Sequence, residues 1–118
     1  MVAEVKQGDI YWINLPEPKK SEPGFRRPCV VVQNDTFNRS RIKTTVICIL
    51  TTNLRLSKAP GNVALDEGEA NLPKSSVVNV SQILTVNKSD LLLKEKIGQL
   101  SPSRINLIIK GLRLVFSV

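Results

Sequence analysis

Histidine is absent from this 118-residue sequence. Its absence excludes the imidazole acid–base pairs and Ser-His-Asp triads on which many hydrolases rely, and it also excludes histidine-ligated metal sites. Any catalysis by this chain must therefore use arginine, lysine, carboxylate or hydroxyl side chains. We accordingly expect neither a metal nor a cofactor.

Cysteine and aromatic residues are scarce. Cys29 and Cys48 are the two cysteines, and each lies in an apolar run. Their spacing matches no zinc or redox motif, so we expect reduced core residues, with a buried disulfide as the alternative. The aromatic residues are one tryptophan, one tyrosine and three phenylalanines. The core must therefore be built from valine, isoleucine and leucine.

Long apolar segments are also missing. No run approaches the ~20 apolar residues that a membrane-spanning helix needs, and the N-terminus lacks the hydrophobic stretch of a signal peptide. We therefore expect a cytoplasmic protein that does not enter a membrane.

Positive charge, in contrast, is abundant. The 17 Lys and Arg residues outnumber the 10 Asp and Glu residues, which gives a net charge of +7. Such a balance suits a polyanionic partner, either nucleic acid or an acidic protein segment. The densest group of basic residues comprises Lys19, Lys20, Arg26, Arg27, Arg39, Arg41 and Lys43.

The hydrophobic pattern predicts one domain, residues 1–118, that is mainly β with a C-terminal helix. Ser101 is a suitable N-cap, Pro102 fits the first helical position, and apolar residues then recur with helical spacing. Gly111 should weaken this helix by roughly 1 kcal/mol relative to alanine. The expected strands are 9–15, 29–33, 44–50, 62–65, 76–80, 82–86 and 96–100, with a helical turn at 88–91 and loops at 16–27, 36–43 and 55–60.

Two segments carry groups suited to phosphate chemistry. Arg26 and Arg27 end a charged loop and, with Pro28, lead into an apolar strand. A guanidinium offers several fixed donors to a phosphate. Thr51, Thr52 and Asn53 follow another apolar strand. If these two strands are neighbours, Arg27 and Thr51 share one rim of the sheet.

Together these segments resemble the MazF/PemK family of toxin endoribonucleases. The similarity lies in Gly8-Asp-Ile-Tyr-Trp-Ile-Asn-Leu15, in Ser21-Glu22 followed by Arg27-Pro28, in Val30-Val-Val-Gln-Asn-Asp35, in Leu50-Thr51-Thr52 and in Ser81-Gln82-Ile83. It implies an SH3-like small β-barrel, the toxin fold shared by MazF, PemK and CcdB. It also implies a homodimer and a MazE-like antitoxin with an acidic C-terminal segment.

The resemblance implies metal-independent, sequence-specific cleavage of single-stranded RNA. The ribose 2′-hydroxyl would attack the adjacent phosphorus and leave a 2′,3′-cyclic phosphate (or 3′-phosphate) and a 5′-hydroxyl. Arg27 matches the catalytic arginine and Thr51 the catalytic threonine. Glu22 matches a supporting acidic residue, which would accept the 2′-hydroxyl proton or orient Arg27. The candidate substrate-binding residues are Arg26, Lys19, Lys20, Asn34, Arg39, Thr52, Asn53 and Gln82.

Three alternatives remain open from sequence. The first is a gyrase poison of the same fold, which uses a C-terminal tryptophan, whereas the single tryptophan here is Trp12. The second is a non-catalytic barrel that binds RNA or an acidic peptide. The third is a metal-dependent nuclease built on Asp66, Glu67 and Glu69, although one acidic turn is more typical of a solvated loop.

Overall fold

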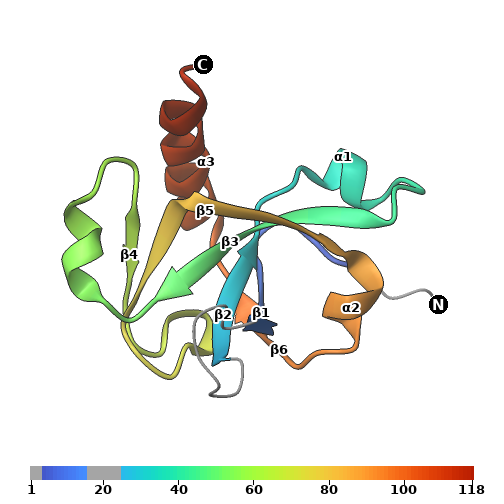
Figure 1. The fold of residues 1–118 in the computed structure, drawn as a ribbon, viewed down its shortest axis with the longest axis horizontal. Helices are drawn as coiled ribbons and strands as arrows, with labels where there is room; N and C mark the ends of the chain where they lie inside the picture. Colours follow the sequence, from blue (N-terminus) through green and yellow to red (C-terminus); the bar gives the residue numbers. More distant parts are fainter. Residues whose placement is uncertain (1–3, 16–24) are drawn as a thin grey trace.

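The computed structural model describes residues 4–15 and 25–118 (Figure 1). In these ranges the chain forms six strands, three α-helices and two 3-10 helices. They are, in chain order, β1 (Asp9–Leu15), β2 (Phe25–Val31), α1 (Asp35–Asn38), β3 (Thr44–Thr51), η1 (Leu54–Lys58), β4 (Val63–Leu65), η2 (Glu69–Asn71), β5 (Ser76–Asn87), α2 (Lys88–Leu92), β6 (Lys96–Gln99) and α3 (Pro102–Phe116).

The strands form one antiparallel sheet in the order β4-β5-β3-β2-β1-β6. The sheet curls into a half-barrel, and α3 stands against its β4–β5 side (Figure 1). This arrangement confirms the predicted mainly β fold with a C-terminal helix. The strand adjacency that the sequence left open is also met, because β2 pairs with β3.

Two predicted strand boundaries are wrong. The strand expected at 29–33, with Pro28 at its entrance, runs from Phe25 to Val31, because residues 25–28 already pair with β1. Proline is tolerated there since β2 pairs with β3 only from Cys29 onward, which leaves Pro28 with one strand neighbour. The two strands expected at 76–80 and 82–86 are one strand, β5. A bulge interrupts its pairing, because Cys48 faces Ile83 while Ile49 faces Asn79.

A hydrophobic cluster covers each face of the sheet. Alternation along β2 and β3 sends Val30 and Leu50 into the cluster beneath α3, and sends Cys29 and Ile49 into the cluster on the opposite face. Both cysteines are buried and free, as predicted. Burial raises the pKa of each thiol to about 12.

Helix α3 follows the predicted boundaries. The Ser101 side chain accepts a hydrogen bond from the Arg104 amide, and Pro102 opens the helix. Gly111 is buried where α3 crosses the chain at Gly61, and a Cβ on Gly111 would lie 2.1 Å from the Gly61 carbonyl oxygen. Within residues 4–15 and 25–118, no helix has the length and apolar character needed to cross a membrane.

Candidate active site

Arg27 and Thr51 meet at one end of the sheet, which the sequence predicted only on the condition that their two strands are neighbours. Arg27 is in β2 and Thr51 ends β3, and the Arg27 Nη1 donates to Thr51 Oγ1 over 3.4 Å. Both residues lie on the face of the sheet that carries Cys29 and Ile49. This hydrogen bond is long for an N–H donor. The two side chains are thus adjacent at this end of the sheet.

The turn after β3 sets the orientation of the Thr51 hydroxyl. Thr51 Oγ1 also accepts the backbone N–H of Asn53, over 3.1 Å. A hydroxyl has two acceptor lone pairs and one hydrogen. With Arg27 and Asn53 both donating to the oxygen, the hydroxyl hydrogen can point only to a further acceptor. Thr51 is therefore oriented as a donor, beside a guanidinium, and this combination suits a phosphate oxygen.

Arg26 does not accompany Arg27. The two neighbours in β2 project to opposite faces, because successive strand residues alternate. The Arg26 guanidinium lies over the Trp12 ring, with its carbon 4.1 Å from the ring centroid. Such a distance is that of a cation–π contact. The structure thus pairs Arg27 with Thr51 and Arg26 with Trp12, and the sequence did not separate these two roles.

A cavity of about 350 Å³ opens beside this edge of the sheet. Trp12, Arg26 and Pro28 line it from β1 and β2, while Thr52 lies at the end of β3. Lys74, from the segment between β4 and β5, also lines it. Sequence reasoning missed Lys74, because nothing in the local pattern shows that this segment returns to β2. The adjacent Pro73 was the one available sign of a fixed turn.

The other substrate-binding candidates lie in several places. Asn53 caps η1, since its side chain accepts the Arg55 amide, and its own backbone amide donates to Thr51. Gln82 is exposed in the β5 bulge. Asn34 and Arg39 flank α1, which lies at the opposite end of β2 and β3 from the Arg27–Thr51 pair (Figure 1). Three further candidates fall outside the described residues: Lys19, Lys20 and Glu22.

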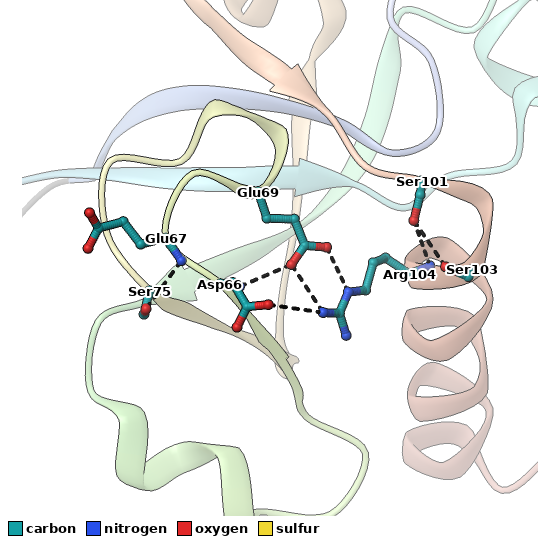
Figure 2. Close-up of polar contacts among 7 residues, drawn as sticks. All are labelled: Asp66, Glu67, Glu69, Ser75, Ser101, Ser103 and Arg104. Atoms are coloured by element: carbon teal, nitrogen blue, oxygen red, sulfur yellow. Dashed lines mark hydrogen bonds and ion pairs between the residues drawn. The ribbon is translucent and has the colours of Figure 1, made fainter.

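Asp66 and Glu67 of the acidic turn are exposed, as the sequence predicted, whereas Glu69 is half-buried and paired with Arg104. Arg104 of α3 donates from Nε to Glu69 Oε2 over 2.6 Å and from Nη2 to Glu69 Oε1 over 3.1 Å (Figure 2). Burial alone would raise the Glu69 pKa, but the hydrogen bonds from Arg104 and from the Asp66 amide lower it. Glu67 points away from this pair. In the described part of the chain, no cluster of three or more acidic or cysteine residues could hold a metal ion.

Fold and site together define a small basic β-protein in which Arg26, Arg27 and Lys74 line one cavity at the end of β2. Residues 6–116 match the model of the family described as PemK-like, MazF-like toxin of type II toxin–antitoxin system. The chain belongs to this family.

Curated relatives extend the comparison over most of the chain. The chain is 39% identical over 114 residues to endoribonuclease MazF6 of Mycobacterium tuberculosis (strain H37Rv), covering 97% of this chain and 98% of the relative. It is 35% identical over 101 residues to endoribonuclease MazF of Staphylococcus epidermidis, covering 86% and 82% respectively.

Solved structures show the same fold. An endoribonuclease in complex with its cognate antitoxin from mycobacterial species superposes with a TM-score of 0.77 at 24% identity, covering 97% of this chain and 96% of that one. The Mycobacterium tuberculosis toxin MazF-mt6 superposes with a TM-score of 0.72 at 20% identity, covering 93% and 97%. At these identities the superpositions establish the fold alone.

Proposed function

We propose that this protein is a toxin endoribonuclease that cleaves single-stranded RNA at the Arg27–Thr51 pair. The observation that carries the proposal is the 3.4 Å approach of Arg27 Nη1 to Thr51 Oγ1, with the hydroxyl oriented as a donor. The relatives at 35–39% identity are endoribonucleases and cover 86–97% of this chain. Their activity supports the same reaction class here.

The proposed reaction needs no nucleophile from the protein. The ribose 2′-oxygen attacks the neighbouring phosphorus, the bond from phosphorus to the 5′-oxygen breaks, and a 2′,3′-cyclic phosphate forms. The protein supplies alignment and charge stabilisation. Arg27 stabilises the negative charge that develops on the phosphorane oxygens, and Thr51 donates a hydrogen bond to one of them. A guanidinium remains protonated at neutral pH, so the role of Arg27 is electrostatic.

Two protons must move in this reaction. The 2′-hydroxyl loses its proton to a base, for which Glu22 is our candidate, and the departing 5′-oxygen gains a proton from solvent or from the same carboxyl. Neither transfer involves a metal ion. DNA lacks the attacking hydroxyl, so it should bind as an analogue without being cut.

The proposed partners follow from charge and family. We propose inhibition by a MazE-like antitoxin whose acidic C-terminal segment is steered by the net charge of +7. That segment would cover the site that RNA needs. We further propose a homodimer and a preference for particular RNA sequences, because sequence in RNA is read mainly from unstacked bases in single strands.

The deciding experiment is cleavage of a long single-stranded RNA by purified, antitoxin-free protein in EDTA. The cut ends are mapped by sequencing and tested for a 5′-hydroxyl. We expect discrete cuts that Arg27→Ala slows at least about 100-fold. The control is Arg113→Ala, which removes an exposed arginine of α3 away from the sheet edge and should cut normally.

Two outcomes would contradict the proposal. Normal cleavage by Arg27→Ala would show that Arg27 is not part of the active site. Failure of the folded protein to cleave several varied RNAs would show that it is not a nuclease. Retained RNA binding would then indicate a binding module, and inhibition of DNA gyrase would indicate a gyrase poison.

A further inference from the structure

We propose that the cavity beside Trp12, Arg26 and Lys74 binds one unstacked nucleotide that flanks the cleaved phosphate. The base would stack on the layer formed by Trp12 and Arg26, and Lys74 would contact the adjoining phosphate. This proposal rests on the proposed function for its substrate. It assigns to Trp12 and Lys74 a role that the sequence did not suggest.

The first support is the geometry of the stacked layer. The Arg26 guanidinium lies over Trp12 with its carbon 4.1 Å from the ring centroid, and Arg26 is exposed while Trp12 is half-buried. The guanidinium thus contacts the indole ring while Arg26 as a residue stays exposed to solvent. Unstacked bases bind to aromatic rings and to arginine planes of this kind. Trp12 and Arg26 together present an aromatic ring and a cation at the wall of the cavity.

The backbone fixes this layer in place. Trp12 of β1 faces Pro28 of β2, and Asn14, two residues after Trp12 in β1, faces Arg26. Trp12 and Arg26 are thus diagonal neighbours on one face of a two-strand ladder. A platform built on paired strands keeps its orientation when the ligand is absent. Less conformational entropy is then lost on binding.

The second support is Lys74 on the other side of the cavity. Its backbone is held on both sides, because Pro73 precedes it and the buried Ser76 donates its hydroxyl to the Lys74 carbonyl oxygen over 2.9 Å. Figure 1 shows that the segment between β4 and β5 runs beside the start of β2. Among the described residues that line the cavity, the charged ones are Arg26, Arg27 and Lys74, all positive. This cavity therefore favours an anion.

The third support is continuity with the proposed site of cleavage. Arg26 and Arg27 are consecutive, and the cavity extends to Arg27 and to Thr52, the residue after Thr51. A phosphate held between Arg27 and Thr51 would thus have a neighbouring nucleotide beside Arg26. A volume of about 350 Å³ accommodates a ligand of roughly nucleotide size. The start of β2 would therefore hold the cleaved phosphate on one face of the sheet and the flanking nucleotide on the other.

The test uses an uncleavable probe, so that it does not depend on catalysis. Trp12 is the single tryptophan of the chain, and its fluorescence therefore reports on this cavity alone. Single-stranded oligodeoxynucleotides of thymidine, deoxyadenosine or deoxycytidine are titrated into wild-type protein, and affinity is measured in parallel by anisotropy of a labelled oligonucleotide. We expect saturable quenching of Trp12 by at least one probe.

Variants then separate the two contacts. Arg26→Gln should weaken binding about tenfold through loss of stacking. Lys74→Gln should weaken the binding of all probes by a similar factor. It should also reduce the slope of log affinity against log salt concentration by about 0.7, because one phosphate contact is lost. On cleavable RNA both variants should raise KM and retain kcat. The control is Lys110→Gln, an exposed lysine of α3 away from the cavity, which should change none of these values.

The results distinguish this inference from the proposed function. Cleavage of RNA with no quenching of Trp12, and with normal KM in Arg26→Gln and Lys74→Gln, would overturn the subsite and leave the nuclease intact. Quenching of Trp12 by the oligonucleotides without cleavage of RNA would support the subsite and contradict the proposed nuclease activity. Quenching by a polyglutamate peptide, but by none of the oligonucleotides, would overturn the subsite in favour of an acidic protein segment.

Discussion

The Arg27 guanidinium lies 3.4 Å from the hydroxyl oxygen of Thr51, although 24 residues separate them in sequence. The same hydroxyl oxygen accepts the amide of Asn53. Its hydrogen is therefore the group left to contact a substrate. This arrangement makes the donor property of Thr51, and not its size, the feature that catalysis should require.

Replacement of Thr51 tests that requirement. Thr51→Val keeps the side-chain shape but removes the donor, so we expect cleavage of single-stranded RNA to slow about 100-fold, as for the loss of one oxyanion-stabilising donor. Thr51→Ser keeps the hydroxyl and should lose far less. Single-turnover rates at saturating enzyme measure both. Equal rates for the valine and serine variants would show that the hydroxyl plays no part in the reaction.

The strand pattern made this pair predictable on the condition that the two strands are neighbours, and local signals made the helix predictable. Arg27 comes just before an apolar strand core and Thr51 just after another, so pairing of the two strands was sufficient to join them. The N-cap Ser101 and the following Pro102 likewise fixed the start of α3. These features depend on residues close in sequence or on one strand pairing.

Other features depend on tertiary contacts that a single sequence does not reveal. Pro28 suggested a strand start, but pairing with β1 extends β2 back to Phe25 and so places Arg26 and Arg27 on opposite faces. The return of Lys74 to β2 and the crossing of α3 at Gly61 depend on the whole sheet. Local propensity carries no information about such contacts.

Asp9 is a buried carboxylate on which several elements depend. Its side chain is 1% exposed and accepts the Lys6 amide, the Tyr11 hydroxyl and the Gln99 amide, and it pairs with Lys96 over 3.1 Å. Burial, and then the neighbouring Asp9 charge, raise the pKa of Tyr11 to about 12. This network joins the N-terminal turn and β1 to β6.

Asp9→Asn should therefore destabilise the fold by about 3 kcal/mol, because an amide NH₂ replaces one carboxylate oxygen and then faces groups that are themselves hydrogen-bond donors. Urea denaturation gives the free energy of unfolding. The matched control is Asp66→Asn, whose side chain is 89% exposed and which should change stability by less than about 0.5 kcal/mol. A loss for Asp9→Asn no larger than that of the control would contradict a structural role for the network.

The Glu69–Arg104 pair should make stability depend on pH. The folded-state pKa of Glu69 is lowered, since the hydrogen bonds from Arg104 and the Asp66 amide outweigh the effect of burial. The unfolded state therefore takes up the Glu69 proton at higher pH than the folded state does. The contribution is complete above the ordinary Glu69 pKa of 4.5, and it falls as the pH drops from there through the folded pKa.

Glu69→Gln should accordingly cost about 1 kcal/mol at pH 7, a modest value because both side chains keep contact with solvent. The difference from wild type should shrink below pH 4.5 and disappear in stronger acid. Urea denaturation between pH 3 and pH 7 measures it, and Glu67→Gln, whose side chain points away from Arg104 (Figure 2), serves as the control. A difference that stayed constant across this range would show that the carboxylate charge contributes nothing.

For Gly111→Ala, helix propensity and packing predict opposite changes in the free energy of unfolding. In an isolated helix, alanine is more favourable than glycine by about 1 kcal/mol. In the folded protein, a Cβ at Gly111 would lie 2.1 Å from the Gly61 carbonyl oxygen, which is backbone and cannot rotate away. We expect Gly111→Ala to lower the free energy of unfolding by about 2 kcal/mol, as overpacking does. The exposed neighbour Lys110→Ala should change it by less than about 0.5 kcal/mol. If Gly111→Ala instead stabilised the protein in urea denaturation, α3 would not cross the chain at Gly61 as closely as the structure places it.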